Sequence, residues 1–143
     1  MKRIVRSAIL GHSAHQMFRL VEDIESYPSF IPWCVRASVH ERTQGRTLAT
    51  LEIGYKGVRK ALTTENLNIP DKSIEMTLVR GPFRSFHARW HFTALEEAAA
   101  RIEFQVEYDF SNAVLERLLG PIFDNLAGTM VDIFTRRAET FGA

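Results

Sequence analysis

The sequence is short of cysteine and of long apolar runs. Cys34 is the one cysteine in 143 residues, so neither an internal disulfide nor a cysteine-based zinc cluster can form. No stretch approaches the ~20 apolar residues that cross a bilayer. The basic N-terminus carries an apolar run that is too short for a signal peptide. These absences favour a cytoplasmic protein, with a peripheral position on the inner membrane as the alternative.

An excess of charge of one sign is also lacking. Eighteen Lys and Arg residues stand against seventeen Asp and Glu residues, and the net charge is +1. Without a concentrated basic stripe, DNA is not an expected partner. Sequence signatures of a phosphate loop, a zinc protease or a serine hydrolase are absent as well. A content of 45% hydrophobic and 24% charged residues is typical of a folded chain, and its length suits one domain over 1–143.

Alternating apolar and polar residues are the main pattern that is present. In the segment 102–110, apolar and aromatic residues alternate with acidic and polar ones, which is typical of a strand with one buried face. Similar segments are separated by turn residues at Gln44-Gly45, Gly57, Pro70 to Lys72 and Gly81-Pro82. Together with 2–10, these segments predict six or seven antiparallel strands with one covered face.

Two segments predict helices. Ser13 is a suitable N-cap for a helix that begins at Ala14, and Asn112 for a long amphipathic helix over 113–141. Gly120-Pro121 is expected to interrupt and kink the long helix. That helix is also the one segment long enough to cover the sheet. The predicted fold class is therefore α+β, a curled antiparallel sheet wrapped around a long C-terminal helix, with a short helical insert after the first strand.

The stretch SYPSFIPWC, residues 26–34, places bulky apolar side chains around two prolines, where regular structure is not expected. A helix is about 10–12 Å wide, which is narrower than a curled sheet, so large side chains or a ligand must fill the space beside it. A rigid apolar turn at the mouth of such a space would act as a lid. The aromatic residues of the strands would equally suit an ordinary core, and both interpretations stay open.

Four stretches together resemble one known family. They are VEDIESYPSFIPWC (21–34), RGPFRSFHARWHF (80–92), IEFQVEYDFSN (102–112) and LGPIFDNLAGTMVDIFTRRAETFG (119–142). They are similar to the coenzyme Q-binding proteins, whose bacterial members are also called ribosome association toxins, within the START-like (polyketide cyclase/dehydrase and lipid transport) superfamily. The resemblance covers the whole chain and implies a helix-grip fold. The segment SFHAR after GPF departs from the more polar stretch expected there, which bears on the shape of a pocket and not on the fold.

The resemblance implies a carrier or chaperone of a hydrophobic ligand, ubiquinone or a similar isoprenoid, that supports respiratory electron transport. No other cofactor and no metal is expected. On this interpretation the lid is formed by Tyr27, Pro28, Phe30 and Trp33. The wall of the cavity is formed by Trp90, Phe104, Tyr108, Phe123 and Met130. Tyr55 or Arg80 would hydrogen-bond a quinone oxygen.

The bacterial members imply a second function, binding of the large ribosomal subunit and inhibition of subunit association. This function predicts a basic contact surface on the outside of the sheet. The candidates for that surface are Arg36, Arg42, Arg46, Arg59 and Lys60.

An enzyme is not expected. His87 and His91 would lie ~13 Å apart along one strand, on the face opposite Trp90. Cys34 has no base near it in sequence.

Overall fold

The computed structural model describes residues 1–141 as a seven-stranded antiparallel sheet with helices on one side. Its strands are β1 (Lys2–Leu10), β2 (Cys34–Thr43), β3 (Arg46–Tyr55), β4 (Val58–Ile69), β5 (Ser73–Arg80), β6 (Phe83–Glu96) and β7 (Ala99–Phe110). The helices are α1 (Ala14–Glu22), the 3₁₀ helix η1 (Ile24–Ser29) and α2 (Ala113–Phe141). Gly142 and Ala143, the end of the predicted 1–143 domain, lie outside the described residues.

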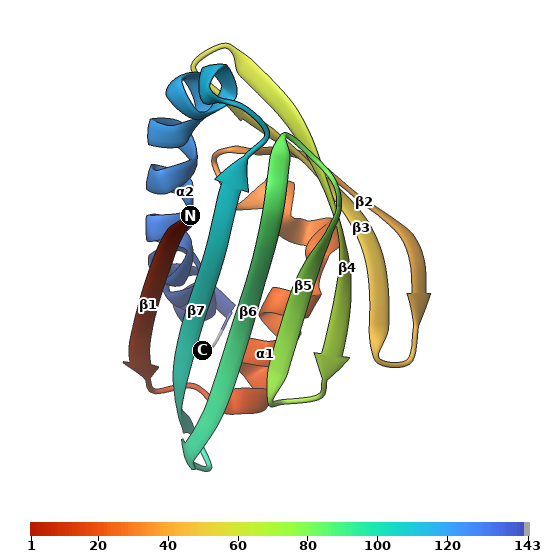
Figure 1. Cartoon of the computed structure of the whole chain (residues 1–143). Coiled ribbons are helices and arrows are strands. Elements are labelled where there is room, and N and C mark those ends of the chain that lie inside the picture. The colour runs from red at the N-terminus through yellow and green to blue at the C-terminus, as the bar shows by residue number, and fades with distance from the viewer. Residues whose placement is uncertain (142–143) are drawn as a thin grey trace.

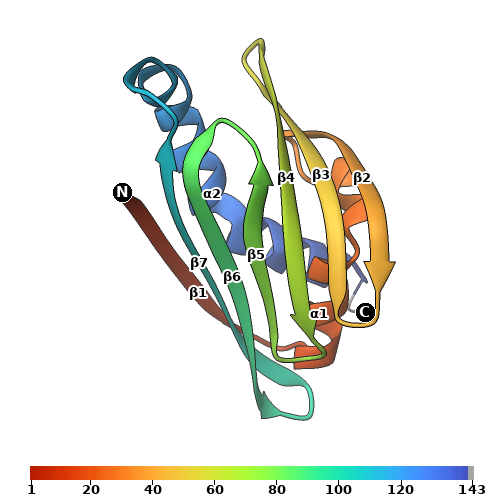
Figure 2. The same cartoon turned by 45° about the vertical axis from the view of Figure 1, so that its right-hand side comes forward.

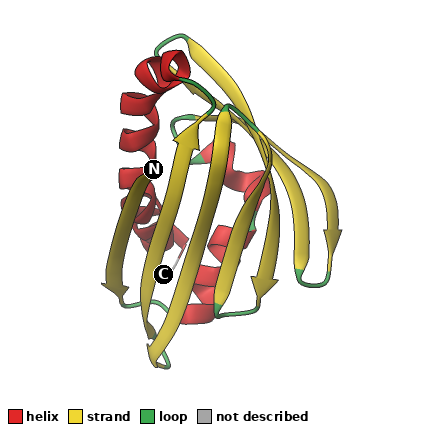
Figure 3. Ribbon diagram, in the orientation of Figure 1, coloured by secondary structure: helices red, strands yellow, loops and turns green. Residues whose placement is uncertain are grey.

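The sheet curls around the long helix. Its strand order is β1-β7-β6-β5-β4-β3-β2, so β1 and β2 form the two edges. Figures 1 and 2 show α2 running across the concave face of the sheet, with α1 and η1 on the same side. There η1 contacts β2, and α1 contacts β6, β7 and α2. Figure 3 shows the resulting arrangement of one sheet layer and one helix layer. The predicted fold class is confirmed, with seven strands.

The turns follow the predicted chemistry. Lys56 and Gly57 have φ of 49° and 82° and form a two-residue hairpin between β3 and β4. This left-handed conformation is the one that such short hairpins require. Asp71, with φ of 63°, occupies the turn after Pro70, and aspartate tolerates that region better than most residues.

The helix starts are also as predicted. The Ser13 hydroxyl accepts a hydrogen bond from the Gln16 amide at 3.0 Å, and the Asn112 side chain accepts one from the Leu115 amide at 2.9 Å. Both contacts satisfy an amide that the first turn of a helix leaves without a partner. These two caps fix where α1 and α2 begin.

The predicted break at Gly120-Pro121 is wrong, because α2 continues through both residues. A proline removes the hydrogen bond to the carbonyl four residues earlier. Here that carbonyl belongs to Arg117, and both Arg117 and Pro121 lie on the exposed side of the helix. Water can therefore solvate the carbonyl, and the helix tolerates the proline.

The expectation that residues 26–34 lack regular structure is wrong in part. Residues Ile24–Ser29 form η1 with Pro28 inside it, because the φ fixed by proline suits a 3₁₀ turn. Trp33 and Cys34 are neighbours in the sequence, yet both are buried, which a regular strand would not allow on a sheet with one covered face. A β-bulge between Cys34 and Arg36 shifts the parity at the start of β2.

Aromatic side chains fill the middle of the interior. Phe134 of α2 is fully buried and meets Tyr27, Phe30 and Trp90 at ring-centroid distances of 5.5, 5.4 and 5.2 Å. All three contacts are edge-to-face, the arrangement that aromatic quadrupoles prefer. The insert is thus packed onto α2 and is not held away from it.

Candidate functional site

Two hollows lie at opposite ends of the concave face. The first, here called the apolar hollow, lies under the β3–β4 hairpin and the start of α2 and has a volume of about 30 Å³. Its lining is aliphatic and aromatic, apart from the polar ends of Tyr55 and Lys60. The lining residues are Ile53, Tyr55, Val58, Lys60, Ala61, Leu62, Pro82, Phe83, Phe110, Leu119, Ile122, Phe123 and Leu126.

Local sequence explains how the walls of the apolar hollow form. A Cβ on Gly81 would lie 3.1 Å from the Leu62 side chain, so glycine lets the β5–β6 turn approach β4 closely. Phe83 stacks on Phe110 at 4.9 Å and meets Phe123 of α2 at 5.0 Å. These rings close the hollow toward the sheet centre and leave it small.

The predicted ligand-binding residues are only partly brought together. Tyr55 and Phe123 line the apolar hollow. Trp90, Phe104, Tyr108 and Met130 are buried in the continuous core. Trp90 and Phe104 contact each other at 4.7 Å.

The four residues predicted to form a lid are not among those that line the apolar hollow, although the Trp33 carbonyl accepts a hydrogen bond from Gly54 of β3 beside it. Tyr27 and Trp33 are buried, whereas Pro28 is exposed and Phe30 lines the second hollow. Arg80 is also exposed and does not line the apolar hollow. The insert is therefore at the far end of α2 from the hollow that it was expected to cover.

A polar network beside the apolar hollow was not visible in the sequence. The Tyr108 hydroxyl donates a hydrogen bond to the carboxylate of Asp124 on α2, and Lys2 of β1 lies 3.5 Å from the same carboxylate. Burial and this hydrogen bond raise the pKa of Tyr108, so the phenol stays protonated and acts as the donor. The network ties the first strand and α2 to the sheet. Its residues come from β1, β7 and α2, which are far apart in the sequence and meet only in the folded structure.

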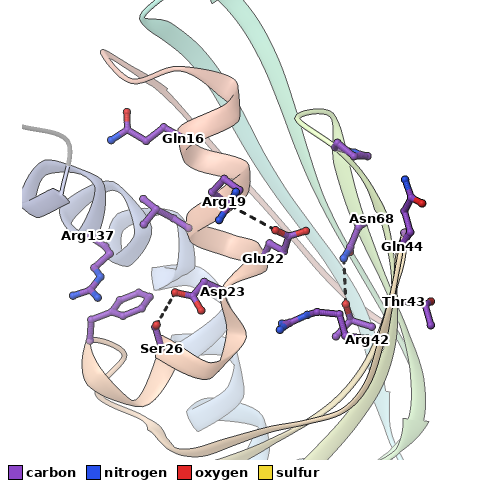
Figure 4. A pocket seen from close by; sticks show the side chains of 15 residues that line it. Gln16, Arg19, Glu22, Asp23, Ser26, Arg42, Thr43, Gln44, Asn68 and Arg137 are labelled. Atoms are coloured by element: carbon purple, nitrogen blue, oxygen red, sulfur yellow. Dashed lines mark hydrogen bonds and ion pairs between the residues drawn. The ribbon is translucent and has the colours of Figure 1, made fainter.

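The second hollow, here called the polar cleft, is open and has a volume of about 720 Å³. Figure 4 shows Arg19, Glu22, Asp23 and Ser26 of the helical insert on one side and strand residues, among them Asn68, on the other. Most of its charges neutralise one another, as with Arg19 and Glu22 at 3.8 Å. The Asn68 Oδ1 atom is buried and has no hydrogen-bond partner in the described part of the chain.

Arg42 crosses the polar cleft to hold the insert. Its two terminal nitrogens donate to the two Glu25 carboxylate oxygens at 2.8 and 2.9 Å. The Arg42 hydrogen bond holds the pKa of Glu25 below its usual range. The prediction that Arg42 lies on the outside of the sheet is wrong. A β-bulge between Val39 and Glu41 pairs Arg42 with the buried Thr47 and turns it to the concave face.

Comparison with known proteins identifies the relationship. Residues 10–135 match the model of the family described as polyketide cyclase / dehydrase and lipid transport. The chain belongs to this family. It is 42% identical over 139 residues to the ribosome association toxin RatA of Vibrio cholerae, a match that covers 97% of this chain and 96% of the toxin.

Two further proteins are similar to the chain. The chain is 29% identical over 136 residues to the mitochondrial coenzyme Q-binding protein COQ10 homolog B of Xenopus laevis, covering 92% of this chain and 56% of that protein. The Zhui aromatase/cyclase of Streptomyces sp. R1128 superposes with a TM-score of 0.86 at 12% identity, covering 96% of this chain and 93% of that one. The second likeness shows the fold alone.

This family member carries few groups suited to catalysis inside its core. Burial raises the pKa of the Cys34 thiol to about 11, which disfavours the reactive thiolate. His87 is exposed on the convex face, with its Nε2 3.5 Å from Glu75. Among residues 1–141, no three His, Cys, Asp or Glu side chains are grouped closely enough to hold a metal ion.

The other four basic residues predicted for a ribosome contact differ from one another in their face of the sheet and in their acidic neighbours. Arg59 pairs with Glu52 at 3.1 Å, and Arg46 with Glu65 at 2.7 Å. Lys60 lines the apolar hollow and so lies on the concave side, where the pairing of β4 with Ile53 of β3 places it. Arg36 is exposed on β2 beside Glu52 in the register.

Proposed function

We propose that this protein binds the large ribosomal subunit and hinders its association with the small subunit. The observation that carries the proposal is the 42% identity with a ribosome association toxin along nearly the whole of both chains. Identity at this level over a full fold supports a shared partner more strongly than fold likeness does. We infer a binding protein and not an enzyme.

The small interior volume supports a function of the surface. Ligand pockets usually measure about 300–1,000 Å³, whereas the apolar hollow has about 30 Å³. Such a space holds a water molecule or two. A quinone with an isoprenoid tail needs the core to open first, and contact with a ribosome does not.

The ribosomal contact is expected to use arginines on the convex face. Arg36 and Arg59 lie on β2 and β4, on the side of the sheet away from α2. Glu52 of β3 is opposite Arg36 in the register and forms an ion pair with Arg59 at 3.1 Å. An exposed ion pair such as Arg59–Glu52 contributes little stability, so the arginine can exchange its partner for an RNA phosphate. Phosphate contacts make binding strongly dependent on salt.

Sucrose-gradient centrifugation of purified subunits tests the proposal. Added protein should sediment with the large subunit at low salt and lower the fraction of joined ribosomes. Arg36→Gln and Arg59→Gln together should weaken this effect severalfold, whereas Lys72→Gln, in the exposed turn between β4 and β5, should leave it unchanged. A gradient that the wild-type protein leaves unaltered at every salt concentration would show the proposal to be wrong.

Binding of a ubiquinone-like lipid is a second candidate, favoured by one specific observation. The apolar hollow is lined by Tyr55 and Phe123 and lies between elements that could part, the β3–β4 hairpin and α2. The family's lipid transport description and the likeness to a coenzyme Q-binding protein agree with it. An opened hollow would extend toward Phe83 and Tyr108, while Arg80 at the end of β5 would meet a polar head.

Lipid extraction from gently purified protein tests this second candidate. Mass spectrometry should find a near-stoichiometric isoprenoid if the hollow opens in the cell. Leu126→Trp, which places a large ring in the apolar hollow, should abolish uptake of added quinone and leave ribosome binding unaltered. An empty extract without quinone uptake would contradict lipid carriage only.

A further inference from the structure

Two exposed aliphatic side chains of α2 adjoin the apolar hollow at one end of the molecule. The β3–β4 hairpin, the β5–β6 turn and the start of α2 meet at the end that carries the apolar hollow, as Figures 1 and 2 show. This part is called the hairpin end below. There Val114 and Leu118 of α2 are 64% and 61% exposed and lie four residues apart, so they form one aliphatic patch and not two scattered side chains.

These side chains continue into the apolar hollow. Val114, Leu118 and Ile122 follow one another at intervals of four residues along α2, so they share one face of the helix. Ile122 lines the hollow, while the first two residues lie outside it. An apolar surface thus runs from the solvent to the mouth of the hollow.

Basic side chains surround this apolar surface. Lys56 and Lys60 lie on the β3–β4 hairpin, Arg80 ends β5, and Arg117 lies in the second turn of α2. All four are exposed, and none forms an ion pair within residues 1–141. Glu116 opposes them. Asp109 and Glu52 do not, because Arg84 and Arg59 already neutralise them.

We propose that the hairpin end docks on the surface of a membrane that contains anionic lipids. Val114 and Leu118 would enter the boundary between head groups and acyl chains, and the four cations would contact lipid phosphates. The combination decides the partner. Cations alone suit RNA as well, but RNA contacts gain from aromatic stacking and hydrogen bonds and not from exposed aliphatic side chains. Aliphatic residues ringed by cations are the pattern of interfacial membrane binding.

The proposal goes beyond ribosome binding, because the membrane contact uses a different surface from the ribosome contact. The arginines proposed for the ribosome contact lie on the convex face, whereas the hairpin end lies at the ends of the strands (Figure 2). The apolar hollow opens at this same end, so a lipid that enters it would come directly from the bilayer.

Flotation with lipid vesicles tests the proposal in the absence of ribosomes. The full chain is mixed with vesicles of phosphatidylcholine alone or with vesicles that also contain about 30% phosphatidylglycerol, the anionic lipid that gives the surface its negative charge. The protein should float with the anionic vesicles at low salt and be released at high salt, because a Debye length shrinks to about 3 Å at 1 M salt. Each of Lys56→Gln, Lys60→Gln, Arg80→Gln and Arg117→Gln should lower the partition coefficient about fivefold.

Matched variants at the other end of the sheet provide the control. Leu118→Asp should abolish flotation, whereas Leu95→Asp, an exposed leucine near the β6–β7 turn, should not. Lys72→Gln is the control for the cations. Circular dichroism shows that each variant is folded before it is tested.

Three results would overturn the proposal. The first is no flotation with either vesicle, and the second is equal flotation with both. The third is a loss of flotation in Leu95→Asp or Lys72→Gln that equals the loss in the variants at the hairpin end. If an RNA fragment binds through the same four cations and the vesicles do not bind, the surface is an RNA contact and the membrane proposal is wrong.

Discussion

The hairpin end and the insert end of this sheet differ in what fills them. At the insert end, Phe134 is surrounded by rings from η1 and β6, and the Glu25–Arg42 pair joins η1 to β2. At the hairpin end the interior has a hollow, Val114 and Leu118 of α2 are exposed, and the four cations named above form no ion pair within residues 1–141. Neutralised charge and close packing serve stability, so the end that lacks both is the better candidate for an interaction site.

Size alone would have led to the opposite conclusion. The polar cleft at the insert end is far larger than the apolar hollow, yet it is open to solvent and its charges pair with each other. The small hollow is apolar and adjoins an exposed apolar surface. The chemistry of the walls therefore distinguishes the two ends better than their volumes do.

Truncation of an aromatic side chain should give the largest difference in the free energy of unfolding between the two ends. Phe134→Ala removes a fully buried ring and should lower the free energy of unfolding by about 3–5 kcal/mol. Phe123→Ala, at the partly exposed wall of the hollow, should cost less than about 3 kcal/mol. Urea denaturation measures both. Equal losses would mean that the hairpin end is as tightly packed as the insert end.

Removal of a tyrosine hydroxyl should distinguish the two ends next. Tyr108→Phe removes a hydrogen bond to the charged Asp124 and should cost about 1.5–3 kcal/mol. Tyr27→Phe removes one to the neutral Val21 carbonyl and should cost about 1 kcal/mol. The comparison requires thermal or urea denaturation at pH 7. A larger loss for Tyr27→Phe would reverse the assignment of the stronger contact.

Addition of one or two carbon atoms to a side chain should change the free energy of unfolding with opposite signs at the two places. Val58→Ile extends into the apolar hollow and should stabilise the protein by up to about 0.8 kcal/mol. Ala88→Val, at a fully buried position in β6, should destabilise it by about 1–3 kcal/mol through overpacking. Destabilisation by Val58→Ile would show that the hollow has no usable space.

The smallest expected effect is the pH dependence of the insert. Because Arg42 lowers the pKa of folded Glu25, the pair stabilises the fold above the unfolded glutamate pKa of about 4.3. That contribution is lost as the pH falls through the folded pKa. Both side chains are about half exposed, so the contribution is less than about 1 kcal/mol. Glu25→Gln should therefore lose less stability than the wild type between pH 6 and pH 3, and an equal loss would contradict the prediction.

Part of the candidate site was within reach of sequence reasoning. Tyr55 and Phe123 were predicted as ligand-binding residues on the interpretation that the family resemblance implies, and both line the apolar hollow. Sequence reasoning did not reach the positions of the predicted lid residues, since Tyr27 and Trp33 are packed in the core and Pro28 is exposed. An apolar side chain looks the same in sequence whether it meets a ligand or another side chain, because both environments exclude water.

By itself the sequence determined the elements and their order. Alternating apolar residues, two helix caps and glycine- or proline-containing turns act within a few residues, so they specify six or seven strands and the start of each α-helix locally. Tertiary structure alone decided the rest. Two β-bulges placed Arg42 and Cys34 on the concave side, and the meeting of β1, β7 and α2 joined Lys2, Tyr108 and Asp124. Packing left an apolar hollow under the β3–β4 hairpin. These outcomes depend on contacts between residues far apart in the chain, and local patterns carry no information about them.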